Sequence, residues 1–126
     1  MSTLTKTVLV VEDEPAIRGL VSLLLEGEGF VVDGAPDGQE ALAKLAEQPP
    51  DALVVDLDLP LLNGCDLVRA CRADEALRHL PIIAISGMMG GQAVRDLDVQ
   101  AFLPKPFSLD TLLNTLHGVL RQDTPP

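Results

Sequence analysis

Four apolar runs in this sequence each end on a polar side chain suited to phosphoryl chemistry. If the runs are strands of an open parallel sheet, their carboxyl ends meet at one edge, beside the point where strand order reverses, and ligands bind there. Three carboxylates, a hydroxyl and an ammonium would then share one crevice that suits a magnesium ion and a phosphoryl group. The runs are Val8–Val11 before Glu12 and Asp13, Leu53–Val55 before Asp56, Ile82–Ile85 before Ser86, and Phe102–Pro104 before Lys105.

Asp56 is the expected nucleophile of this crevice, because it ends the third, central strand. A carboxylate can attack phosphorus and hold the phosphoryl group as a mixed anhydride. Because both reacting groups are anionic, positive charge is required, and Mg²⁺ held by Glu12, Asp13 and Asp56 through hard oxygen ligands would supply it. Lys105 would add a fixed charge, and Ser86 would donate a hydrogen bond to a phosphoryl oxygen.

Each of these residues also has an ordinary structural interpretation. An Asp after a strand is commonly a loop residue or a helix cap. The acidic pair before Pro15 could simply favour the positive end of the next helix. It is the combination, with four of five strands ending in complementary groups, that favours a site.

The elements that would position these groups alternate between strand and helix. The strand runs are continuously apolar, as in parallel strands covered by helices on both faces. Strands are expected at Val8–Val11, Phe30–Val32, Leu53–Val55, Ile82–Ile85 and Val99–Leu103. Helices are expected to begin at Pro15, Asp37, Gly64, Gln92 and Ser108.

Local signals support the helices. Pro15 suits a first helical position, Asp37 with Glu40 resembles a capping box, and Ser108 is a typical N-cap. The fourth helix, Gln92–Leu97, would have about two turns. The first helix is expected to present one apolar face, formed by Ile17, Leu20, Val21 and Leu24.

The composition indicates one globular, cytoplasmic domain of 126 residues, and no apolar stretch long enough to cross a membrane. We expect residues 1–5 and 122–126 to be tails around a domain at 6–121. The net charge of −10 and the lack of Trp and Tyr argue against direct nucleic-acid binding. Cys65 and Cys71, six residues apart, are expected to be reduced thiols on different sides of a helix.

Four segments together resemble the receiver domain of bacterial response regulators, and the match extends from about Lys6 to Arg121. The resemblance implies an α/β, flavodoxin-like, doubly wound (βα)5 fold with strand order 2-1-3-4-5. The segments are Val10–Pro15, Val55–Pro60 with Gly64, Ile85–Gly87, and Leu103–Phe107.

The resemblance further implies that Asp56 takes a phosphoryl group from the phosphohistidine of a histidine kinase or phosphotransfer protein. Mg²⁺, with Mn²⁺ as an alternative, would be bound by Asp13, Asp56 and the backbone carbonyl of Asp58. Glu12 would act through water. The domain would be a signalling phosphoacceptor and no enzyme beyond its own phosphorylation and slow autodephosphorylation.

The resemblance also implies how phosphorylation is sensed. Ser86 and Lys105 would contact the phosphate, and the Lys105–Pro106 bond would be cis. Phe102 would rotate after the Ser86 hydroxyl moves inward, although core packing alone also explains an aromatic residue there. The output would be a protein partner or a linked output domain, and the chain would be a monomer or a weak dimer.

Three features depart from the common receiver pattern. Glu12 stands where Asp is commoner. Asp58 and Met88, with Gly87 beside it, form the rim of the site, and residues at such positions influence how fast the phosphoryl group is lost. The segment from Ser86 to Phe102 is short, which puts the usual signalling face in question.

Two other functions stay open. The chain could be a receiver-like adaptor that binds partners without phosphorylation. Alternatively, Asp56-Leu57-Asp58 resembles the Asp-x-Asp motif of haloacid dehalogenase-type phosphatases, in which the second Asp is the general acid–base. The mid-chain position of Asp56 and the short chain count against a phosphatase.

Overall fold

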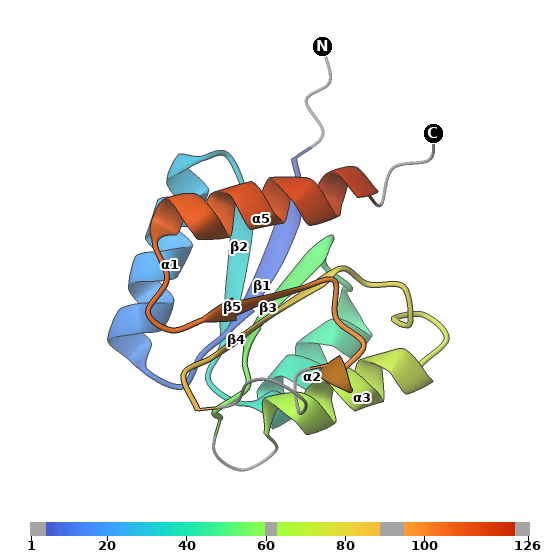
Figure 1. Ribbon diagram of the computed structural model, residues 1–126. Helices are drawn as coiled ribbons and strands as arrows, with labels where there is room; N and C mark the ends of the chain where they lie inside the picture. Colours follow the sequence, from blue (N-terminus) through green and yellow to red (C-terminus); the bar gives the residue numbers. More distant parts are fainter. Residues whose placement is uncertain (1–4, 60–62, 89–94, 123–126) are drawn as a thin grey trace.

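Five short strands form one parallel sheet between two layers of helices in the computed structural model, which describes residues 5–59, 63–88 and 95–122 (Figure 1). The strands are β1 (Thr7–Val11), β2 (Val31–Ala35), β3 (Ala52–Asp56), β4 (Ile82–Ser86) and β5 (Ala101–Pro104). The helices are α1 (Pro15–Gly27), α2 (Gly38–Glu47), α3 (Gly64–Ala73) and α5 (Leu109–Gln122). The first half of the helix predicted at Gln92–Leu97 lies outside the described residues.

The strand order is β2-β1-β3-β4-β5, which confirms the predicted doubly wound topology. The order reverses between β1 and β3, because the chain leaves β1 toward β2 and later returns to the other side of β1. The end of β1 and the end of β3 therefore flank the point at which such sheets bind ligands.

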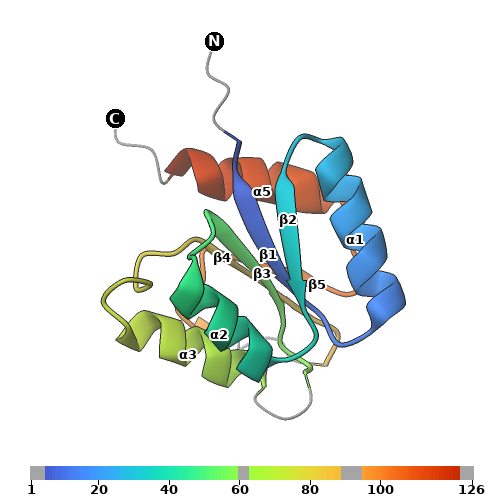
Figure 2. The same ribbon diagram turned by 180° about the vertical axis from the view of Figure 1, so that it is seen from behind.

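Successive side chains of the central strands enter two separate cores, since side chains alternate between the faces of a sheet. Val8 and Val10 pack with residues of α1 and α5, and Leu9 and Val11 pack with residues of α2 and α3. Figure 2 shows the same two layers from behind. Both faces of the sheet are thus covered, which explains the continuously apolar strand sequences.

The predicted caps are confirmed. Pro15 occupies the first turn of α1, and the Asp37 carboxylate accepts a hydrogen bond from Glu40 N–H (2.8 Å). Ser108 Oγ accepts from Thr111 N–H (3.1 Å) at the start of α5. These signals were readable because each depends on residues within one turn.

The apolar face predicted for α1 is not the face that packs on the sheet, although Val21 is partly buried there. Leu25 is fully buried, whereas Ile17, Leu20 and Leu24 are exposed, at 43%, 56% and 36%, as is Leu23 at 65%. The helix packs on β1 and the edge strand β2, so only a narrow stripe of its surface meets the sheet. The other apolar side chains form a strip, Ile17, Leu20, Leu23 and Leu24, that we call the α1 strip.

Two smaller expectations also differ from the structure. Strand β2 begins at Val31 and continues through Asp33 to Ala35, because an edge strand tolerates polar residues on its exposed face. Neither Cys65 nor Cys71 forms a disulfide, as expected, but both are buried in the same core cluster, because α3 buries a broad arc of its surface. Among the described residues, no helix combines the length and the apolar character needed to cross a membrane.

Candidate functional site

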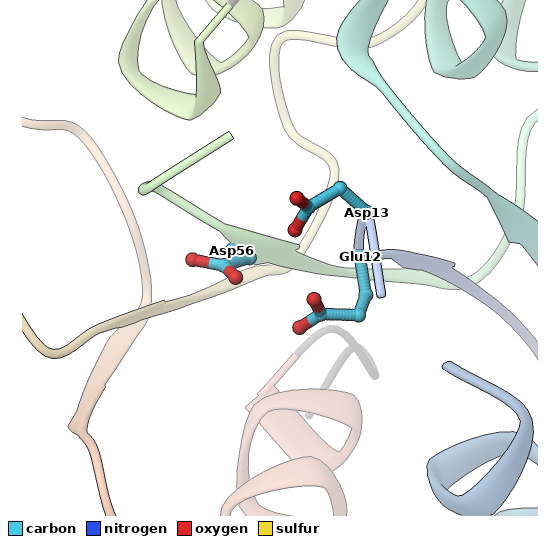
Figure 3. Close-up of side chains that lie close together, drawn as sticks. All are labelled: Glu12, Asp13 and Asp56. Carbon is cyan, nitrogen blue, oxygen red and sulfur yellow. The ribbon is translucent and has the colours of Figure 1, made fainter. Parts of the chain in front are cut away.

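Three carboxylates converge where β1 and β3 end. Glu12 and Asp13 follow β1, Asp56 is the last residue of β3, and one carboxylate oxygen from each lies within 4.8 Å of the others. Figure 3 shows the Glu12 and Asp13 side chains extending from the end of β1 to the same side as Asp56. The structure thus brings together the acidic groups that the sequence assigned to one crevice.

Glu12 is held by backbone and side-chain contacts. Its N–H donates to Ala35 O (3.0 Å), which extends the sheet by one residue, and its carbonyl accepts from the Arg18 guanidinium (2.7 Å). Its carboxylate accepts from Glu14 N–H (3.0 Å). The Arg18 contact fixes the start of α1 against this strand end, and no sequence pattern predicts it.

The electrostatics of this cluster favour a cation. Burial raises the pKa of Glu12 to about 7, and the neighbouring charge of Asp56 adds to this effect, although the Glu14 hydrogen bond opposes it. Three close carboxylates repel one another when ionised. A hard divalent cation would relieve that repulsion, and carboxylate oxygens are the ligands that Mg²⁺ prefers. The residues present therefore fit such an ion.

Asp56 is a buried carboxylate, 4% exposed, with a cation beside it. Its Oδ2 accepts from Lys105 Nζ (2.9 Å), and its Oδ1 accepts from Asp58 N–H (2.8 Å). Gly64, the first residue of α3, fits closely behind it, since a Cβ there would lie 2.7 Å from Asp56 O and 2.5 Å from the Cα of Leu57. The strand end is thus fixed by contacts on several sides.

The Asp58 side chain makes contacts that were not predicted from the sequence. Its Oδ1 accepts from the Ser86 hydroxyl (2.7 Å), and its Oδ2 accepts from Gly87 N–H (3.0 Å). Lys105 Nζ lies 3.8 Å from the same Oδ2. From the sequence, Asp58 was expected to act through its backbone carbonyl and at the rim of the site, and the only available signal for the side-chain contacts was an acidic residue two positions after Asp56.

Lys105 follows β5, and a backbone hydrogen bond joins it to Ser86. Its N–H donates to Ser86 O (3.0 Å), so the pairing of β4 with β5 continues up to the two functional side chains. Burial alone would lower the pKa of Lys105, but the hydrogen bond and charge of Asp56, helped by Glu12 and Asp58, raise it above its ordinary value. The Lys105–Pro106 peptide bond is cis.

Two further predicted residues lie near the crevice or on the strand beside it. Phe102 is half-buried, pairs with Ala84 across β4 and β5, and packs against the core cluster below α2 and α3. Met88 is 85% exposed, and its N–H donates to Ser86 Oγ (3.1 Å). Both positions are compatible with the roles given to them, since each touches an element that carries Ser86.

A cavity of about 480 Å³ lies beside the crevice and is largely apolar. Its walls include Ile17 of the α1 strip and Phe107, and they also include Asp56 and Lys105. Asp56 and Ile17, which lies at one end of the α1 strip, therefore line the same cavity.

Comparison with protein families and curated proteins gives a consistent result. The model of the response regulator receiver domain matches residues 8–117. The transcriptional regulatory protein TrcR of Mycobacterium tuberculosis is 38% identical over 118 residues, which cover 93% of this chain and 46% of the relative. The response regulator MprA of Mycolicibacterium vanbaalenii is 37% identical over 121 residues, 94% of this chain and 52% of the relative. The chain thus spans about half the length of these relatives.

Solved structures show the same fold. The chemotaxis response regulator CheY4 of Vibrio cholerae has a TM-score of 0.85 at 33% identity, covering 92% of this chain and 99% of that one. The receiver domain of the sensor histidine kinase PA1611 of Pseudomonas aeruginosa has a TM-score of 0.84 at 30% identity, covering 94% and 99%. The latter is described with a magnesium ion coordinated in its active-site cleft.

Proposed function

Because this chain belongs to the response regulator receiver domain family of two-component systems, we propose that it is a phosphoacceptor, with Asp56 as the residue that receives the phosphoryl group. The observation that carries the proposal is the environment of Asp56. This buried carboxylate contacts Lys105 and belongs to a cluster of three carboxylates that fits a divalent cation.

In the proposed reaction, a carboxylate oxygen of Asp56 attacks the phosphorus of a phosphohistidine on a histidine kinase or phosphotransfer protein. An O–P bond forms as the P–N bond breaks, and the electron pair of that bond returns to the imidazole nitrogen, which then takes up a proton. Lys105, hydrogen-bonded to the acceptor, offsets the negative charge that the incoming group brings.

A bound Mg²⁺ would supply further positive charge for the phosphoryl oxygens. We assign its binding to Asp13, Asp56 and the backbone carbonyl of Asp58, with Glu12 acting through water. Mn²⁺ has similar ligand preferences and is an alternative. The geometry supports this assignment, because one carboxylate oxygen each from Glu12, Asp13 and Asp56 lies within 4.8 Å of the others.

The readout of phosphorylation is assigned to the β4–β5 edge. Ser86 and Lys105 would bind phosphoryl oxygens, and Phe102, on the strand paired with β4, would change its packing in response. Since this edge carries both the donors and the aromatic residue, a shift of one strand reaches the other through their shared hydrogen bonds.

The phosphodonor is proposed to contact the α1 strip, because the cavity that contains Asp56 in its wall also contains Ile17. An apolar surface beside a reactive group is typical of a protein–protein contact.

We also propose that this chain acts in the cytoplasm, because a histidine kinase takes its phosphoryl group from ATP in that compartment. The output is a protein partner or a linked domain, in keeping with relatives about twice as long.

Incubation with acetyl phosphate and Mg²⁺, followed by intact-protein mass spectrometry, tests the function. We expect a gain of about 80 Da, one phosphoryl group, that is absent in Asp56→Asn. Rapid multiple turnover of the donor would instead indicate a phosphatase. A chain that acquires no adduct from acetyl phosphate or from a phosphorylated histidine kinase would be a phosphorylation-independent adaptor.

A further inference from the structure

Two hydrogen-bond donors at the crevice, one of them the Ser86 hydroxyl assigned to the phosphoryl group, already bind an anion that belongs to the chain itself. The Asp58 carboxylate accepts from the Ser86 hydroxyl at 2.7 Å and from Gly87 N–H at 3.0 Å. Lys105 Nζ lies 3.8 Å from one of its oxygens. The Asp58 side chain is only 14% exposed, so these contacts are partly shielded from water.

Two of these donors cannot serve two anions at once. A serine hydroxyl and a backbone N–H each carry one hydrogen to donate, whereas a lysine ammonium carries three. A phosphoryl oxygen on Asp56 that takes a hydrogen bond from Ser86 or Gly87 must therefore take it from Asp58. Two anions in the same site also repel each other, so the carboxylate and the phosphoryl group exclude one another by charge as well.

We propose that the Asp58 carboxylate is an internal substitute for the phosphoryl group, which holds Ser86 and Gly87 before phosphorylation and has to be displaced by it. The inference rests on the proposed function and extends it. Phosphorylation then exchanges one bound anion for another, and Asp58 is a positioning residue that sets how strongly the donors are held in the unphosphorylated state.

The probe is beryllofluoride with Mg²⁺, a stable anionic analogue of an acyl phosphate, titrated into the ¹⁵N-labelled chain and followed by amide chemical shifts. Asp58→Ala removes the competing anion but keeps the backbone carbonyl at position 58. We expect beryllofluoride to bind Asp58→Ala with a dissociation constant about tenfold lower than that for the wild type, because a charged acceptor no longer competes for the donors. Asp58→Asn, which keeps one acceptor oxygen, should give a smaller gain.

Two controls separate this competition from simpler effects. Glu14→Gln removes one exposed negative charge from the residue that follows Glu12 and Asp13, and it leaves Ser86 and Gly87 unchanged. It should change the dissociation constant by less than about twofold. In a Ser86→Ala background, the gain from Asp58→Ala should shrink, because one contested donor is gone. Thermal unfolding monitored by circular dichroism verifies that each variant is folded.

The Gly87 amide gives a second readout. Its proton should lie at low field in the wild type, move upfield in Asp58→Ala, and return to low field when beryllofluoride binds. Equal affinity of wild type and Asp58→Ala, or an equal gain in Glu14→Gln, overturns the inference while leaving Asp56 as a phosphoacceptor. Failure of every variant to bind would instead contradict the proposed function, and with it this inference.

Discussion

Replacing Glu12 by Gln should make the free energy of unfolding of the metal-free protein fall less as the pH rises. An unfolded chain releases the Glu12 proton near the ordinary value of 4.5, whereas the folded chain holds it until about pH 7. Between these values the folded state binds one more proton than the unfolded state. The free energy of unfolding therefore falls as the pH rises, and the stability present below pH 4.5 is lost above pH 7.

The size of the effect follows from the same two values. Because one pKa unit corresponds to about 1.4 kcal/mol, the wild type should lose about 2–3 kcal/mol through Glu12 between pH 5 and 8. Glu12→Gln carries no ionisable group at this position and should lack that loss. Saturating Mg²⁺ should also reduce it, since a bound cation stabilises the ionised carboxylate and lowers its pKa.

The assay is urea unfolding in EDTA at several pH values, followed by far-ultraviolet circular dichroism, because the chain has no Trp or Tyr for fluorescence. Glu14→Gln, a neutralised carboxylate on the exposed side of the same turn, serves as the control and should follow the wild type. If Glu12→Gln loses stability as steeply as the wild type, the burial argument for Glu12 is wrong.

Three further substitutions test other parts of the site. Lys105→Ala should lower the free energy of unfolding by only about 1–2 kcal/mol, because the side chain is one-third exposed. It should nevertheless abolish the phosphorylation-dependent affinity for a partner in a pull-down. An unchanged phosphorylation-dependent affinity would contradict the role of Lys105. Gly64→Ala should cost about 1–3 kcal/mol in urea unfolding and slow labelling by acetyl phosphate, because its Cβ would meet the backbone at Leu57. Its matched control, Gly118→Ala in α5, has open space and should be neutral or stabilising. Leu20→Asp should slow phosphotransfer from the histidine kinase several-fold but leave labelling by acetyl phosphate unchanged, and equal slowing with both donors would refute the docking role of the α1 strip.

The strands, their order and the convergence of the acidic groups were predictable, because each depends on a short local pattern or on a property of parallel sheets. Continuous apolar runs identified β1, β3 and β4, and the residues after them had to meet at one edge. The exposed side of α1 was not predictable, since its sequence is apolar around most of the helix and the edge position of the helix decides what is buried.

The contacts of the Asp58 side chain could not be predicted from the sequence either. They depend on the distance between the loop after β3 and the end of β4, which is a tertiary property. An acidic residue at this position reads equally well as a solvated rim residue. What the sequence did identify were the donors, Ser86 and Lys105, because both follow apolar strands directly.

The backbone bond from Lys105 N–H to Ser86 O has a consequence for how the site tolerates mutation. Because the two donors terminate paired strands, the entropy lost in ordering them is lost when the sheet forms, and little remains to be lost when an anion binds. The affinity of the crevice for an anion therefore depends on the pairing of β4 with β5 along its whole length. Ile83 pairs with Ala101 at the other end of these strands. A substitution that disrupts this pair would weaken anion binding by loosening the strand pairing, although neither residue contacts the anion.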